Sequence, residues 1–416
     1  MGISHKHICK EDGIKLKREL GLFQTTVCGV GIILGAGIYV LIGIAAGYAG
    51  NAVWISFLFA AVLAALTGLG YAELSSIFKT DAGEYDYTKS AFNHKLALII
   101  GLLVIFTGIA TSAAVALGFG GYVNALTSIP IIMAALALIL LMSFVNFYGI
   151  KESSMLNMIF TFFEVAGLLI IIFIGIKHIG SINYFELTKG LNGVFKAAAL
   201  AFFAYTGYEA VVKLSEETKN PTKTIPRAVI LSIIITSILY VLVAVSAVSV
   251  IGWENLSSSK APLADVAKAA FGSTAFLILG LIALASTANT VLMALLVTSR
   301  TIYGMSEEKS LPKKLSIVHS KRRTPWLAIL LTLVFAAAFA LIRNLEFVAN
   351  LSNIFIFLTF AIINLSVIVL RYKKPNASRK FRVPLNIGKF PVLIFLGIIV
   401  SLFMLYYSVV NAFFAI

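Results

Sequence analysis

Long apolar runs alternate with short polar connections along nearly the whole chain. An α-helix needs about 20 residues to cross the ~30 Å hydrocarbon layer of a bilayer, and the apolar runs reach that length. Apolar residues are continuous within each run and do not alternate with polar ones, which excludes the strands of a membrane β-barrel. The pattern predicts an all-α polytopic membrane protein of about eleven transmembrane helices, at residues 21–47, 52–78, 96–125, 128–148, 154–176, 193–212, 226–250, 273–304, 325–343, 347–370 and 390–412.

Composition supports the membrane assignment. Of 416 residues, 60% are apolar and only 12% are charged, whereas soluble proteins carry about 25% charged residues. This balance excludes a water-soluble enzyme and a disordered chain. Cys9 and Cys28 lie in the polar N-terminal tail and in the first apolar run, so a secreted disulfide scaffold is excluded as well.

The basic residues are distributed unequally between the two sides of the predicted helices. With the N-terminus in the cytoplasm, 27 of the 33 Lys and Arg residues fall on the inner side and six on the outer side. Positive charge favours cytoplasmic loops, so we expect a multi-pass protein of the cell (plasma or inner) membrane with a cytoplasmic N-terminus. The net charge of +15 then orients the helices and meets anionic lipid. Its scatter over several loops argues against a nucleic-acid partner.

Two predicted helices contain residues that favour a break near mid-membrane. In the first, Gly35 and Gly37 flank Ala36 about 22 Å from the inner end, at 1.5 Å per residue. Glycines allow the backbone to leave helical geometry there. In the sixth, Gly207 lies near the middle among polar residues, including Glu209.

The two predicted breaks lie five helices apart in helices of opposite direction, which is the pattern of an inverted five-plus-five repeat in a transporter. Broken helices expose N–H groups and carbonyls, so an amino acid zwitterion fits between them. Its carboxylate would meet the N–H groups after Gly35, and its ammonium the carbonyls before Gly207. The repeat divides the chain into a cytoplasmic tail (1–20), a first repeat (21–176), a second repeat (193–370) and an additional helix (390–416).

Three acids fall inside predicted helices, where charge is costly and acids are usually functional. Glu164 lies ~20 Å beyond Lys151 with no basic residue nearby on the same helix. Desolvation favours the protonated form of such a carboxyl, so Glu164 is a candidate proton carrier, or else a structural hydrogen-bonded group. Glu209 is a second proton candidate or holds the break in its helix, and Glu73 has a packing or gate role.

No histidine falls inside a predicted helix, so a proton route must use carboxyls. No metal-ligand spacing, nucleophile triad or phosphate-binding loop is present either. We therefore expect no enzymatic activity, no metal and no cofactor.

Four segments resemble the amino acid–polyamine–organocation (APC) superfamily. They are GAGIY in the first helix, YAELSS…AGEYDYTKSAF after the second, GYEAVVKLSEETKNPTKTIPRAV from the sixth onwards, and NTVLMALLVTSRTIYGMSEEKSLPKKLSIVHSKRRTPWLAI from the eighth into the ninth. The resemblance covers residues 21–330 in the family's order. It implies the inverted-repeat fold of the bacterial leucine transporter, with substrate bound at the breaks of helices one and six. Most members have twelve helices, whereas eleven are expected here. This difference does not affect the core of helices one to ten, and concerns only the dimer or the periphery of the bundle.

The resemblance also implies roles for particular residues. Amides at the first break would bind the substrate carboxylate, carbonyls at the second break would meet the amine, and Phe203 would be the outer gate. Thr107 and Thr111 would face the substrate side chain. The expected substrate site comprises Ile33, Gly35, Ala36, Gly37, Ile38, Thr107, Thr111, Phe203, Ala204, Tyr205, Thr206 and Gly207.

Glu164 aligns with a position where a proton-coupled member has a lysine amine in a former sodium site. This supports ion coupling by H⁺, or by Na⁺ with Ser286 or Thr287 as further ligands. The expected function is import of small or neutral amino acids by H⁺ symport and alternating access. An exchanger, a permease for cationic amino acids acting through Glu209, and a non-transporting amino acid sensor are the alternatives. A channel is not supported, because the sequence has no filter-like carbonyl loop and no repeated ring of charged residues.

Overall fold

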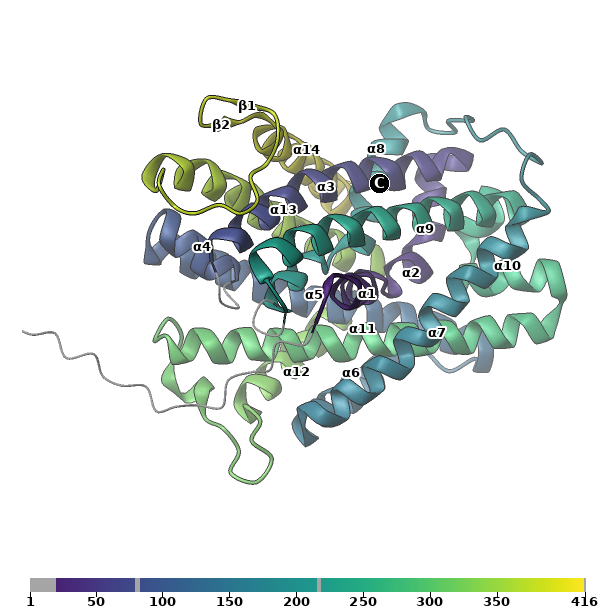
Figure 1. The fold of residues 1–416 in the computed structure, drawn as a ribbon. Coiled ribbons are helices and arrows are strands. Elements are labelled where there is room, and N and C mark those ends of the chain that lie inside the picture. The colour runs from purple at the N-terminus through teal and green to yellow at the C-terminus, as the bar shows by residue number, and fades with distance from the viewer. Residues whose placement is uncertain (1–19, 79–82, 215–217, 415–416) are drawn as a thin grey trace, which may run out of the picture.

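The computed structural model describes residues 20–78, 83–214 and 218–414, which fold into a bundle of α-helices (Figure 1). In this part of the chain, eight helices are long and apolar enough to cross a membrane. This confirms the all-α polytopic class, while the number of crossings and the five-plus-five division stay predictions. The tail predicted at 1–20 lies outside the described residues except for Leu20. The helices and strands are α1 (Leu22–Ile33), α2 (Ala36–Ala49), η1 (Gly50–Ala52), α3 (Val53–Ile77), α4 (Glu84–Ala91), α5 (His94–Thr127), α6 (Ile131–Tyr148), α7 (Ile150–Ile176), α8 (Gly190–Ala201), η2 (Phe202–Tyr205), η3 (Tyr208–Leu214), α9 (Pro221–Ser258), α10 (Pro262–Phe271), α11 (Ser273–Glu307), η4 (Lys313–Ser316), α12 (Trp326–Ala340), α13 (Leu345–Lys373), β1 (Asn386–Ile387), β2 (Phe390–Pro391) and α14 (Val392–Phe414).

The apolar runs locate the long helices closely. The run at 273–304 forms α11 (Ser273–Glu307), and the run at 128–148 forms α6. Each long helix exposes large apolar side chains, such as Leu140 at 62% and Leu281 at 64%. Water does not favour so much exposed apolar surface, so these faces are the ones that meet lipid acyl chains.

Short elements that were not expected from the apolar runs lie between the long helices. They include α4, α10 and the two-stranded hairpin β1–β2, in which Ile387 pairs with Phe390. Figure 1 shows α4, the hairpin and the start of α9 together at one end of the bundle, with α10 at the other. Several basic connections therefore gather at one end. That this end is cytoplasmic stays a prediction.

Glu73 lies in a buried ion cluster at this basic end. The Arg371 side chain donates to both carboxylate oxygens of Glu73, through Nε at 2.8 Å and through a second guanidinium nitrogen. Arg379 lies 3.4 Å from Glu73 Oε1, and the backbone N–H of Val383 donates to Oε2 at 2.9 Å. The cluster joins α3 to the end of α13 and to the connection before α14, which is a packing role for Glu73.

Candidate functional site

The first helix is interrupted directly before Gly35. Helix α1 ends at Ile33, Leu34 has an extended conformation (φ −62°, ψ 107°), and Gly35 (φ −141°, ψ −175°) precedes the first residue of α2. Gly37 lies inside α2, contrary to the expectation that it belongs to the break. A Cβ on Gly37 would lie 2.5 Å from the Cα of Ala204. Gly37 is therefore needed for close packing between α2 and η2.

We expect Gly37→Ala to reduce transport strongly, because a methyl group has no space between α2 and η2. Overpacking of this kind costs about 1–3 kcal/mol, equivalent to about a five- to 150-fold change in an equilibrium that requires this contact. Gly304→Ala in α11 is the matched control, since nothing lies within 4 Å of its Cβ position. Initial uptake rates and unfolding temperatures of both variants test this. Equal rates for the two variants would contradict the packing role of Gly37.

The second interruption lies between α8 and η3. Helix α8 ends at Ala201, η2 follows, and Gly207 has φ +122°, a conformation that favours glycine. The N–H of Gly207 donates to Glu209 Oε2 at 2.8 Å. Of the two roles expected for Glu209, this contact favours stabilisation of the break.

Tyr240 of α9 connects the two interruptions. Its buried hydroxyl lies 3.0 Å from the carbonyl oxygen of Ile33 and 2.9 Å from that of Ala204. Both carbonyls belong to interrupted segments, where helical hydrogen bonds are missing. Because the hydroxyl lies within hydrogen-bond distance of both carbonyls, it holds the two breaks next to each other.

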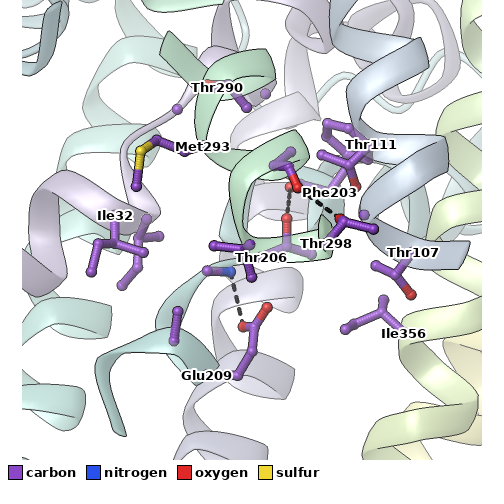
Figure 2. A pocket seen from close by; sticks show the side chains of 18 of the residues that line it. Ile32, Thr107, Thr111, Phe203, Thr206, Glu209, Thr290, Met293, Thr298 and Ile356 are labelled. Carbon is purple, nitrogen blue, oxygen red and sulfur yellow. Dashed lines mark hydrogen bonds between the residues drawn. The ribbon is translucent and has the colours of Figure 1, made fainter. Parts of the chain in front are cut away.

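A cavity of about 340 Å³ lies between the two interruptions. Figure 2 shows Ile32 and Met293 facing Thr107, Thr111 and Ile356 across it. Of the residues expected at the site, those lining the cavity are Ile33, Gly35, Gly37, Thr107, Thr111, Phe203, Ala204, Thr206, Gly207 and Glu209. Ala36, Ile38 and Tyr205 are buried beside it, and the hydroxyl of Tyr205 donates to the carbonyl of Phe57 instead, at 3.0 Å.

Several backbone groups expected to bind substrate already have a partner. The N–H of Ala36 donates to Thr290 Oγ1 at 2.9 Å. The carbonyl of Phe203 accepts from the hydroxyl of Thr206 at 2.8 Å, and that of Ala204 accepts from Tyr240. A carbonyl oxygen has two lone pairs, so each can accept a second hydrogen bond. The first turn of α2 also has N–H groups without a carbonyl one turn earlier in the helix.

The described titratable residues in the cavity wall are acids rather than bases. Glu84 of α4 and Glu209 both line it, and none of its described lining residues is Lys, Arg or His. Next to Glu84, burial and the carboxylate of Glu308 raise the pKa of Asp86 above its usual value. Sequence reasoning missed Glu84 because it was assigned to a loop. Its carboxylate makes the α4 end of the cavity acidic.

Glu164 lies outside the cavity, buried between α7 and α11. Ser286 donates a hydrogen bond to Oε1 of Glu164, and the hydroxyl of Tyr39 donates to its backbone carbonyl at 2.7 Å. Oε2 is buried without a hydrogen-bond partner among the described residues. Thr287, an expected ion ligand, donates to the carbonyls of its own helix at Ala283 and Leu284, at 2.8 and 3.0 Å.

A short hydrogen-bonded path joins Glu164 to the first break. Ser286 contacts Glu164, the hydroxyl of Thr290 lies 3.2 Å from the carbonyl of Ser286, and Thr290 accepts from the N–H of Ala36. Ser286 and Thr290 are four residues apart and therefore share one face of α11. This spacing is the signal in the sequence that could have identified Thr290.

Comparisons with known proteins identify the family of this chain. The amino acid permease family model matches residues 20–416. The branched-chain amino acid permease BcaP of Bacillus subtilis (strain 168) is 32% identical over 412 residues, covering 94% of this chain and 88% of that protein. The methylthioribose transporter of the same organism is 33% identical over 393 residues, covering 89% and 84%. The vacuolar cationic amino acid transporter 4 of Arabidopsis thaliana is 28% identical over 402 residues, covering 89% and 66%. The chain thus belongs to the amino acid permease family, within the APC superfamily of membrane transporters.

Proposed function

We propose that this protein imports neutral amino acids together with H⁺ by alternating access. The observation that supports substrate binding is the cavity between the two helix breaks. Its walls combine backbone amides and carbonyls with apolar side chains such as Val104, Met293 and Ile356. The substrate's carboxylate would bind the first turn of α2, where the helix dipole favours negative charge. Its ammonium would bind carbonyls of the η2 segment.

The proposed proton carrier is Glu164. Glu164 Oε2 is a buried acceptor without a hydrogen-bond donor among the described residues. A proton on Glu164 would supply the missing donor, since a protonated carboxyl carries one O–H. Thr287 donates its hydroxyl proton within α11 but keeps its oxygen lone pairs, so Na⁺ with Ser286 or Thr287 as ligands is the alternative coupling ion. An exchanger, in which Glu164 is only structural, remains the alternative mechanism.

Coupling would run through α11. Protonation of Glu164 changes the hydrogen bond with Ser286, and Thr290, one turn along the same face, contacts the N-terminus of α2. Phe203, which is 3% exposed, would close the outer side of the cavity. The inverted repeat at 21–176 and 193–370, the cytoplasmic N-terminus and the cell-membrane location belong to the same proposal.

A second candidate function, transport of cationic amino acids, is supported by the acidic residues in the cavity wall. Glu84 and Glu209 line the cavity, and acids in its wall would favour a cationic side chain. Relatives named for branched-chain and for cationic amino acids both match the chain. We favour neutral substrates because Glu209 is engaged with Gly207, and the remaining wall beside the breaks is largely apolar.

Competition for uptake separates the two candidates. We expect leucine, isoleucine and valine to inhibit uptake of labelled leucine into liposomes, and lysine and arginine to inhibit it weakly. Glu84→Gln should then change leucine uptake less than about twofold, because leucine needs no side-chain carboxylate. Strong inhibition by lysine, abolished by Glu84→Gln, would establish the cationic permease instead. Methylthioribose is tested as a further competitor, because a methylthioribose transporter is among the proteins similar to this chain.

A further inference from the structure

The connection between α11 and α12 is strongly basic. Between Lys309 and Thr324 it contains six Lys and Arg residues and no acid. All six side chains are exposed, and none forms an ion pair with a described acidic residue. In contrast, the basic connection after α13 uses Arg371 and Arg379 internally, in the cluster around Glu73. The α11–α12 connection therefore has positive charge available for an external anion.

A turn fixes part of this connection against the end of α6. The N–H of Arg323 donates to the carbonyl of His319 at 2.8 Å, and the N–H of His319 donates to the carbonyl of Thr324 at 2.9 Å. The buried Thr324 hydroxyl then donates to the carbonyl of Phe147 at 3.0 Å, and the rings of Phe147 and His319 are in contact. Lys321, Arg322 and Arg323 are therefore held at the end of α6 in a defined turn.

Arg322 caps an apolar strip on the exterior of α6. Its guanidinium lies 3.9 Å from the ring centroid of Tyr148, and the Tyr148 ring contacts that of Phe144. Phe144 and Tyr148 are 57% and 42% exposed, and Leu141 continues the exposed strip. We call Leu141, Phe144, Tyr148 and Arg322 the α6 strip. Trp326, at the start of α12, follows the same turn, and Trp and Tyr are typical at the membrane interface.

We propose that the α6 strip binds an anionic phospholipid, with an acyl chain along Leu141 and Phe144 and the phosphate at Arg322. A guanidinium can stack on an aromatic ring and still direct its N–H groups towards phosphate oxygens. Tyr148 would hold it in that orientation, and Lys321 and Arg323 would add charge. The combination of an exposed apolar strip with a guanidinium that has no ion pair among the described residues matches the two chemical parts of a phospholipid.

Trp326 provides a local probe of this site. The chain has three tryptophans, so Trp54→Phe with Trp253→Phe leaves Trp326 as the reporter in the full-length protein. The reporter protein is placed in phosphatidylcholine bilayers that contain either brominated phosphatidylglycerol or brominated phosphatidylcholine, whose bromines quench nearby tryptophan. We expect phosphatidylglycerol to quench Trp326 at about a fivefold lower mole fraction, the factor that one basic group at the membrane surface supplies.

Arg322→Gln should bring the two quenching curves together, and Arg322→Lys should retain part of the preference. Arg382→Gln is the matched control: it removes one charge from an exposed arginine that is hydrogen bonded to the carbonyl of Gly388, and should leave the preference unchanged. Tyr148→Phe, which keeps the ring, should retain the preference, whereas Tyr148→Ala should reduce it. Equal quenching by both lipids in the reporter protein, or equal losses in Arg322→Gln and Arg382→Gln, would overturn the site.

Discussion

Replacing Glu164 with Gln is expected to abolish accumulation of leucine driven by a pH gradient. With the membrane potential held at zero and one H⁺ per substrate, a gradient of two pH units supports accumulation of up to about 100-fold, since each pH unit is equivalent to a factor of ten. The amide introduced by Glu164→Gln keeps an oxygen that accepts from Ser286, but it cannot release a proton. The variant should therefore bring leucine only to equal concentrations on the two sides.

Exchange distinguishes lost coupling from lost folding. Gln resembles a protonated carboxyl, so Glu164→Gln should still exchange internal for external labelled leucine at a rate near that of the unmodified protein. Glu254→Gln removes an exposed acid of α9 and should leave both activities intact. Unchanged pH-driven accumulation in Glu164→Gln would show that Glu164 is structural and would favour an exchanger or another coupling ion.

The second large effect is expected on stability, from Glu73→Gln. This change leaves the buried guanidinium of Arg371, which is 3% exposed, without its carboxylate, and weakens the contact with Arg379. Removing one partner of a buried ion pair costs about 3–5 kcal/mol. The unfolding midpoint in detergent should therefore fall by roughly 5–10 °C, measured by the fluorescence of a thiol-reactive or intrinsic reporter during heating.

An exposed ion pair provides the comparison for Glu73. Lys89 and Glu308 are 2.7 Å apart with side chains 46% and 41% exposed, and such pairs contribute about 0–1 kcal/mol. Glu308→Gln should shift the midpoint by less than about 2 °C. Similar shifts for the two variants would mean that the buried cluster does not hold α3, α13 and the connection before α14 together.

The sequence predicts the long helices well because their apolar residues form continuous runs, as for α6 and α11. Glycine positions are harder to interpret. Gly207 takes the positive φ that only glycine accommodates easily, whereas Gly37 is helical and serves close packing against Ala204. A sequence pattern does not separate these two uses, because the difference lies in what approaches the backbone from another helix.

The parts of the site that sequence reasoning missed depend on contacts between distant segments. Thr290 and Ala36 are 254 positions apart and Tyr240 and Ile33 are 207 apart, and outside the site Arg371 and Glu73 are 298 apart. Glu84 was missed for a related reason, since α4 is too short and polar to stand out from a loop. Hydropathy reports which residues meet lipid or protein, but not which partner each polar side chain finds in the folded bundle.

We propose that the cavity recognises both charged groups of an amino acid at the two helix breaks. Inhibition of labelled leucine uptake by leucinol, which lacks the carboxylate, and by 4-methylpentanoate, which lacks the amine, tests it most directly in the unmodified protein. A hydrogen bond to a charged group contributes about 1.5–3 kcal/mol, so each analogue should inhibit at least about tenfold more weakly than unlabelled leucine. Inhibition by either analogue at the same concentration as leucine would contradict the proposed role of that break.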